Sequence, residues 1–127
     1  MNLVNLTPHP IVVQTTDDPE SQVTIDPSGT VARVGTTMAN GIVVIASPDN
    51  IFTSQYVPVG DTVVPVHKVS FNAVEGLPSP ADDTIYIVSA MVAQQVSNRG
   101  DVVAPDTGAS AVRKNGNVVA VRGFVRY

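Results

Sequence analysis

Valine, proline and glycine set the strongest constraint on how this chain can fold. The branched Cβ of valine, which supplies much of the 43% hydrophobic content, suits a pleated strand better than a helix. Ten Pro and nine Gly, spread along 127 residues, break the chain into short elements. We therefore expect one domain, residues 1–127, with an α+β fold that is mainly β: antiparallel sheet, one principal helix at about 85–97 and a C-terminal β-hairpin.

The helix is predicted from apolar spacing after the Pro-rich loop 76–83. Positions i, i+3, i+4 and i+7 are occupied by Val88, Met91, Val92, Gln95 and Val96. Asp82 or Asp83 can cap its start, and Asn98 and Gly100 end it. The β-branched run at 84–88 leaves open a strand that continues directly into a helix near Ser89.

Strands are predicted from short apolar runs between turn residues. Residues 2–6 and 11–15 form a strand broken by Pro8 and Pro10, and 22–26 pair with 30–34 across Pro27-Ser28-Gly29. Residues 41–46 form a strand buried on both faces, and 57–71 form one or two edge strands. Asn115-Gly116 is the strongest turn signal and predicts a hairpin between 110–113 and 117–125.

The positive charge of this acidic chain is concentrated near its C-terminus. Residues 97–127 carry Arg99, Arg113, Lys114, Arg122 and Arg126, a balance of +3, whereas residues 1–96 have a balance of −7. This asymmetry predicts a local anion site, because binding long nucleic acid requires a basic domain. No stretch approaches the ~20 apolar residues of a membrane helix, and the first residues lack a signal-peptide pattern, so we expect a cytosolic protein without a membrane partner.

Catalytic, metal and cofactor sites are not predicted. The chain has no Cys, His9 and His67 have no third ligand at a suitable spacing, and no standard nucleotide-binding loop occurs. Asp106-Thr107-Gly108-Ala109-Ser110 is similar to the signature of retroviral-type aspartic proteases. However, Pro105 precedes it and only 21 residues follow Asp106, so we interpret it as an Asp-Gly loop.

Four residues, at three places in the chain, are of types that can bind an anion or stack on a base. Arg33 is isolated among small and apolar residues, and is either a solvated strand residue or a guanidinium presented to phosphate or carboxylate. Ser89 and Ala90 open the helix, where Ser89 either caps it or leaves N–H groups for an anion. Phe71 is either a core residue or a stacking surface for a base.

Four segments carry a resemblance to a family of small phage proteins, the first family of Thoeris anti-defence proteins. They are residues 5–11 (NLTPHPI), 27–34 (PSGTVARV), 86–94 (YIVSAMVAQ) and 121–124 (VRGF). The resemblance implies a sponge that binds the cyclic ADP-ribose isomers made by bacterial TIR-domain enzymes without cleaving them. Some members also capture cyclic oligonucleotides of the CBASS system, at separate sites on a hexamer. It further implies a homo-oligomer, action in the host bacterial cytoplasm, and pockets between subunits.

Site residues are implied by matching these segments. Arg33 corresponds best to one phosphate ligand, and Arg113 or Arg122 to the second. Asn98, with Arg99, follows the helix where a base-contacting Asn is implied. The helix has no Phe, which leaves Phe71 as the substitute for the stacking aromatic residue.

Two other classes of function fit parts of the sequence. A small phage structural or virion assembly protein would also be valine-rich, punctuated by Pro and Gly, and oligomeric. A nucleotide hydrolase similar to trimeric dUTPases would need a carboxylate cluster to hold a metal and its water, for which Asp101 and Asp106 are too few.

Overall fold

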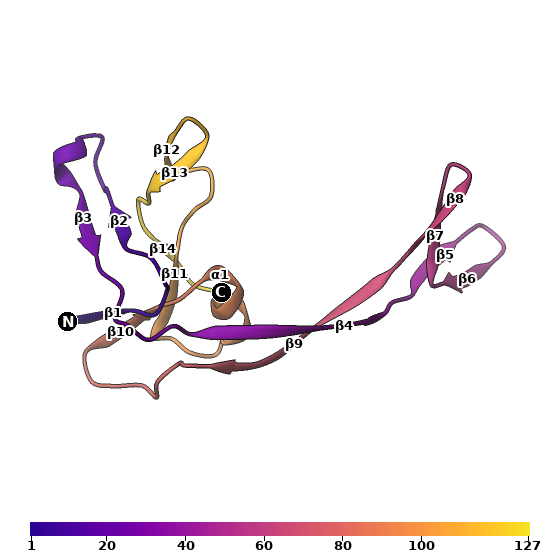
Figure 1. Cartoon of the computed structure of the whole chain (residues 1–127), viewed down its shortest axis with the longest axis horizontal. Helices are drawn as coiled ribbons and strands as arrows, with labels where there is room; N and C mark the ends of the chain where they lie inside the picture. Colours follow the sequence, from indigo (N-terminus) through magenta and orange to yellow (C-terminus); the bar gives the residue numbers. More distant parts are fainter. The chain divides into compact units, whose positions relative to one another are not determined.

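The computed structural model describes residues 1–127 and consists of fourteen short strands, one α-helix and one 3-10 turn (Figure 1). The predicted α+β architecture, mainly β with a single helix, is confirmed. No helix has the length and apolar character needed to cross a bilayer. Internal contacts divide the chain into two compact units: unit 1 is Met1–Val34 with Ala73–Tyr127, and unit 2 is Gly35–Asn72. The single-domain behaviour of residues 1–127 stays a prediction.

Unit 1 contains a four-stranded sheet in the order β1-β10-β11-β14. Its strands are β1 (Asn2–Asn5), β10 (Thr84–Ile87), β11 (Val102–Pro105) and β14 (Phe124–Val125). β10 is parallel to both β1 and β11, whereas β14 is antiparallel to β11. A parallel pair needs a crossover connection, and helix α1 (Ala90–Gln95) supplies it between β10 and β11.

The helix is shorter than predicted. Residues 84–87, expected to begin it, form β10, because this β-branched run pairs with a strand on each side. Ser89 then caps α1: its hydroxyl oxygen accepts a hydrogen bond from the N–H of Val92 at 3.3 Å. Of the two interpretations of this segment, the strand running into a helix near Ser89 is correct.

β10 lies at the centre of the core because both of its faces are covered. Successive side chains of a strand point to opposite faces, and Tyr86 and Ile87 accordingly enter different clusters. Tyr86 packs in the larger cluster with Leu6, Ala32, Val88, Val92, Ala93, Val102 and Ala104. Ile87 packs with Ile11 and Val121 in the smaller one. Each fully buried aliphatic side chain contributes about 1.5–3 kcal/mol.

Two hairpins complete unit 1. One joins β2 (Ile11–Val13) to β3 (Val23–Ile25), with a 3-10 turn, Pro19–Ser21, between them. The other joins β12 (Val112–Lys114) to β13 (Asn117–Ala120), and confirms the C-terminal hairpin. Asn115 and Gly116 both adopt positive φ, 54° and 82°, as a two-residue hairpin turn of this type requires.

The predicted pairing of residues 22–26 with 30–34 is wrong. β3 pairs with β2 instead, and the chain after β3 runs beside the end of β1. There the N–H of Ser28 donates to the carbonyl of Asn5, and that of Ala32 donates to Leu6. Pro27-Ser28-Gly29 therefore redirects the chain along the sheet without closing a hairpin.

Unit 2 is built from two-stranded ladders. β4 (Arg33–Asn40), which begins in unit 1, pairs with β9 (His67–Glu75), which ends there. Between them lie two hairpins, β5 (Val43–Ala46) with β6 (Ile51–Ser54) and β7 (Tyr56–Val59) with β8 (Thr62–Pro65). Residues 57–71, predicted as one or two edge strands, contribute to three strands.

The expectation that residues 41–46 form a strand buried on both faces is wrong. β5 has one hairpin partner, β6, and Val44 is 67% exposed. Gly41 is the single buried residue of unit 2. An apolar strand is buried on both faces only where other elements pack on both sides of it. Within this chain, no element packs in this way on the β5–β6 hairpin.

Candidate functional site

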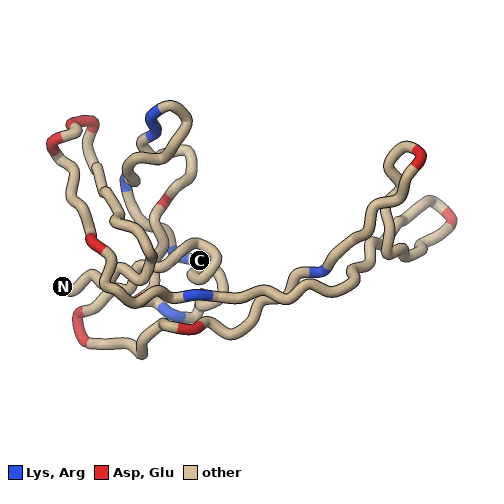
Figure 2. Tube along the Cα trace, in the orientation of Figure 1, with Lys and Arg blue, Asp and Glu red and all other residues tan.

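The arginines of the C-terminal region are engaged by separate partners within unit 1. Arg122 forms an ion pair with Asp17, Nη2 to Oδ1 at 2.9 Å, and donates from Nη1 to the carbonyl of Thr16 at 3.0 Å. These bonds connect the chain after β13 to the loop after β2. Figure 2 shows the basic residues of the chain as separated segments. Arg122 thus has a carboxylate partner already.

Arg113 holds the Asp106 loop. Its guanidinium donates to the carbonyls of Thr107 and Gly108, both at 2.9 Å. Asp106 closes the same loop, because its carboxylate accepts from the N–H of Gly108 at 3.0 Å and the hydroxyl of Ser110 at 3.1 Å. This is an Asx-type turn. Both charged side chains therefore shape the loop itself.

Arg99 and Asp101 form a bidentate ion pair, in which Nε and Nη2 lie 2.8 and 2.9 Å from the two carboxylate oxygens. The hydrogen bonds lower the pKa of Asp101 and raise that of Arg99, opposing the effect of partial burial. Arg99 also donates to the carbonyl of Pro78 at 3.0 Å. The pair therefore fixes the turn after α1 to the Pro-rich loop.

Arg33 differs from these three arginines. It is exposed at the first position of β4, while its neighbour Val34 packs against the larger core cluster. Arg33 takes part in none of the ion pairs or side-chain hydrogen bonds within unit 1. Arg126 shares this property, and its Nη2 lies 4.0 Å from the position of a Cβ on Gly100. These are the two guanidinium groups of unit 1 that form no ion pair or hydrogen bond there.

The start of helix α1 is less suited to binding an anion than the sequence indicated. The Ser89 side chain serves as the N-cap, and Ala90 is exposed. α1 has only six residues, so its dipole is small. Asn98 is exposed in the turn after the helix, and the guanidinium of Arg126 lies near Gly100 in the same turn. Asn98 and Arg126 therefore join Gln95 and Ser97 among the exposed polar side chains near the end of α1.

Phe71 is not a core residue. It lies on β9 in unit 2, and 45% of its surface is exposed. Of its two interpretations, burial in the core is wrong, and its role in stacking stays a prediction. The remaining candidate residues all belong to unit 1.

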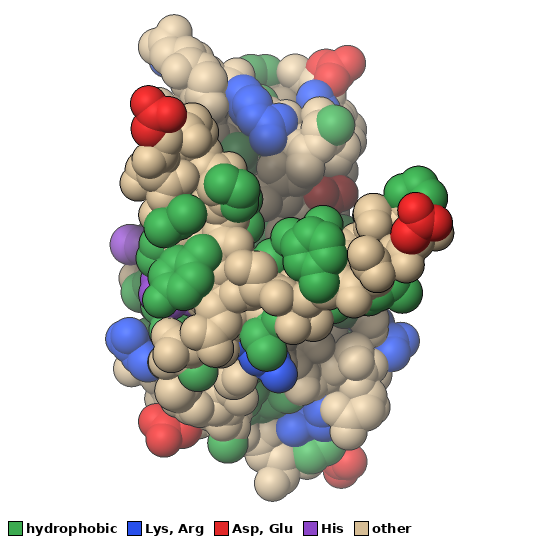
Figure 3. Space-filling view, turned by 90° about the vertical axis from the view of Figure 1, so that its right-hand side faces the viewer, with side chains coloured by type: hydrophobic (Ala, Val, Ile, Leu, Met, Phe, Trp, Pro, Cys, Tyr) green, Lys and Arg blue, Asp and Glu red, His purple; other side chains and the backbone are tan.

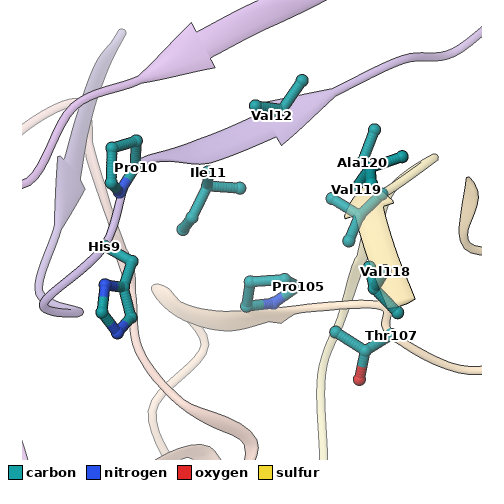
Figure 4. A pocket seen from close by; sticks show the side chains of 10 residues that line it. His9, Pro10, Ile11, Val12, Pro105, Thr107, Val118, Val119 and Ala120 are labelled. Carbon is teal, nitrogen blue, oxygen red and sulfur yellow. The ribbon is translucent and has the colours of Figure 1, made fainter. Parts of the chain in front are cut away.

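A groove of about 390 Å³ opens in unit 1 between β2 and β13 (Figure 4). Ile11 and Pro105 point into the space between the strands, and Val118 to Val121 line the β13 side. The polar side chains among the lining residues are His9 and Thr107. Volumes of this size and walls of this apolar character are common in small-molecule sites.

Two hydrogen-bond networks fix the ends of this groove. The amide of buried Asn5 donates to the carbonyl of His9 at 2.9 Å, and Arg113 holds the carbonyl of Thr107. Arg113 is thus a positioning residue for one wall. None of the site residues predicted from the sequence lines the groove. The available signal was the Thr7-Pro8-His9-Pro10 segment, which places a histidine between two prolines.

The described residues contain no group of three His, Cys, Asp or Glu side chains arranged to hold a metal ion. The two carboxylates considered for a hydrolase already have partners. Asp101 is paired with Arg99, and Asp106 accepts hydrogen bonds within its own turn. The arrangement therefore offers exposed guanidinium groups and an apolar groove as its binding chemistry. Comparison with known proteins finds no matching family model, no matching curated protein and no matching solved structure.

Proposed function

We propose that this protein binds and sequesters cyclic nucleotide signals, cyclic ADP-ribose isomers or cyclic oligonucleotides, in the host bacterial cytoplasm and releases them unchanged. The four segments that resemble Thoeris anti-defence proteins support the proposal, because they meet in unit 1. The N–H of Leu6 donates to the carbonyl of Ile87, and that of Ala32 donates to Leu6. Ile11, Ile87 and Val121 pack together in the smaller core cluster. Segments distant in sequence thus share one framework.

The observation that carries the proposal is that Arg33 is exposed and its guanidinium has no partner within unit 1. A planar guanidinium with free donors suits the oxygens of a phosphate group, and Arg33 is held at the start of a strand whose next residue is anchored in the core. Arg99, Arg113 and Arg122 are less suitable phosphate ligands, since each would have to exchange a protein partner for the ligand. Arg126 is a better second candidate than Arg113 or Arg122.

Sequestration requires a preformed site and slow release, and no reacting group. Apolar contact with a compact cyclic ligand, together with charge-assisted hydrogen bonds to its phosphates, can supply tight binding. A homo-oligomer, a hexamer by resemblance, would complete such a site with residues from a second subunit. The proposal therefore assigns the arginines to binding and assigns no residue to catalysis.

Ligand retention tests the proposal. The purified protein is incubated with cyclic ADP-ribose isomers and cyclic di- and trinucleotides, freed of unbound ligand and denatured, and the released compound is identified. We expect intact ligand in near-stoichiometric amount. Arg33→Gln should weaken binding about tenfold or more, the loss of one charge-assisted contact. Lys114→Gln, which removes an exposed charge from β12, is the matched control.

Other outcomes would reject the proposal in favour of a named alternative. Release of a converted compound would indicate a nucleotide hydrolase. Absence of any retained cyclic nucleotide would favour a phage structural or virion assembly protein. The second alternative has a specific observation in its favour, the exposed apolar hairpins of unit 2.

A further inference from the structure

The chain contains two Asn-Gly pairs, Asn40-Gly41 and Asn115-Gly116, and the structure gives them opposite surroundings. The backbone nitrogen that follows an asparagine can attack the side-chain amide carbon, because the product is a five-membered ring. Glycine favours this step, since it has no Cβ to obstruct the ring and permits the backbone rotation that the step requires. Both pairs therefore have a sequence that can lose its amide spontaneously, and the fold decides which of them does.

The Asn115-Gly116 pair is open to this reaction. Residues 113–119 are all exposed, and nothing lies within 4 Å of a Cβ position on Gly116. The hairpin pairs Lys114 with Asn117, so the N–H of Gly116 lies between the paired residues and donates to no carbonyl group. The attacking nitrogen therefore has neither a hydrogen bond to break nor a neighbour to displace.

The turn that holds this pair can also open. β12 and β13 form a sheet of two strands only, and their register shifts between Val112 and Arg113. A two-stranded hairpin is only marginally stable in water, so its turn opens more often than the core strands do. Such opening lets the Asn115 side chain approach the Gly116 nitrogen.

The Asn40-Gly41 pair is protected by the chain around the start of β9. Gly41 is buried, and its N–H donates to the carbonyl of Val66 at 2.8 Å. A Cβ position on Gly41 lies 2.9 Å from the carbonyl carbon of His67 and 3.0 Å from the backbone nitrogen of Lys68. Ring closure at this pair would have to break the hydrogen bond and displace the backbone of β9.

We propose that Asn115 is a spontaneous deamidation site, selected by the fold from the two Asn-Gly pairs. The Gly116 nitrogen gives its proton to water and forms a bond to Cγ of Asn115. The bond from Cγ to Nδ2 breaks, and ammonia leaves with a proton taken from water. Water then opens the cyclic imide at one of its two carbonyl groups, which leaves an aspartyl or isoaspartyl residue without any redox change. This inference is independent of the proposed ligand.

Either product changes the hairpin. The new carboxylate follows Lys114 and lowers the +3 balance of residues 97–127 by one charge. Figure 3 shows Lys and Arg side chains at separate places on the visible surface, with no continuous basic patch there to offset the change. The isoaspartyl product also adds a carbon atom to the backbone, which a two-residue turn cannot accommodate in the same register. Because Val118 and Val119 line the groove, loosening of β13 would open one groove wall.

Peptide mass spectrometry of aged protein tests the inference. Full-length protein is kept at mildly alkaline pH, where amide protons are lost faster, and both Asn-Gly pairs are followed in one sample. In folded protein, we expect Asn115 to convert at least about tenfold faster than Asn40. In concentrated urea, the two should convert at similar rates. Equal rates in folded protein, or the same difference in urea, would overturn the inference.

A blocked variant tests the consequence for the hairpin. Asn115→Gly has no side-chain amide and suits the same turn, because Gly-Gly also adopts the required positive φ values. A methyltransferase specific for isoaspartyl carboxylates should label aged wild-type protein and not the aged variant. Amide hydrogens of β12 and β13 should exchange at least about tenfold faster in the labelled wild-type protein than in fresh protein, and at the fresh rate in the aged variant. Unchanged exchange in the labelled protein would contradict the loosening of the hairpin.

Discussion

Asn5 is the residue on which the first turn of the chain depends. It is 1% exposed, and its amide donates to the carbonyls of His9 and Ile25 while its oxygen accepts from the N–H and hydroxyl of Thr7. A single side chain therefore connects β1, the turn before β2 and the end of β3. Burial with complete hydrogen bonding makes such a side chain expensive to remove.

Asn5→Ala should lower the free energy of unfolding by about 2–4 kcal/mol, since it leaves the partly buried carbonyl groups of His9 and Ile25 without these donors. Urea denaturation followed by circular dichroism measures the change. Asn2→Ala is the control, because Asn2 is exposed in the same strand. Equal decreases in the free energy of unfolding in the two variants would show that the hydrogen bonds of Asn5 do not stabilise the fold.

The Arg99–Asp101 pair predicts a pH-dependent contribution to stability. The pKa of Asp101 is lowered in the folded state by its hydrogen bonds to Arg99. The contribution is therefore fully present above the unfolded pKa, about 3.9, and is lost as the pH falls through the folded pKa. Asp101→Asn should cost about 1–3 kcal/mol near neutral pH. That difference should shrink below about pH 4.

Denaturation curves across this pH range, with Asp61→Asn as an exposed control, measure that difference. A loss that persists unchanged at low pH would contradict an ionic origin. The Asp61 variant should stay within about 0.5 kcal/mol of wild type at every pH, as surface substitutions usually do.

Elements differ in how far local sequence determines them. β12–β13 was predictable because Asn115-Gly116 tolerates the positive φ values that the turn needs, a property of two adjacent residues. The partner of β3 was not, since pairing with β2 or with residues 30–34 satisfies the same alternation. The ion pair of Arg122 was not predictable either, because its partner Asp17 lies 105 residues away in the sequence.

Two glycines with positive φ, Gly76 and Gly116, differ in the space available for a side chain. Gly76, at φ 79°, follows β9, and a Cβ there would collide with the carbonyl oxygen of Val31. Gly116, at φ 82°, has open space around it. Gly76→Ala should therefore cost about 2–4 kcal/mol, and Gly116→Ala about 1–2 kcal/mol. Thermal unfolding of both variants checks the order, and equal costs would contradict the collision.

At the scale of the whole molecule, the two units differ in how they can be stabilised. Unit 1 has two core clusters around β10, whereas unit 2 buries only Gly41. Composition predicted the β content. It could not predict that exposed apolar side chains concentrate in residues 35–72, because an apolar run has the same pattern whether it is covered by its own chain or by another.

Dilution should therefore affect the two units differently. If hairpin faces are covered by another copy, amide hydrogens of β7 and β8 should exchange slowly in concentrated protein and at least about tenfold faster on dilution. Amides of β10 should keep their protection throughout. Exchange measured by mass spectrometry gives both values from one sample, and identical behaviour of the two segments would contradict the expectation.

The parallel pairing of β1 with β10 has a consequence for the order of events during synthesis. Asn2 to Asn5 align with Thr84 to Ile87. Apart from the segment after β3, which runs beside its end, the first strand translated therefore has no sheet partner until most of the chain has left the ribosome. Contacts this distant in sequence slow folding. Meanwhile the valine-rich hairpins of unit 2 emerge before β10 and can form locally. The nascent chain thus presents many exposed apolar side chains before its core can close, which is the stage at which chaperones would be needed most.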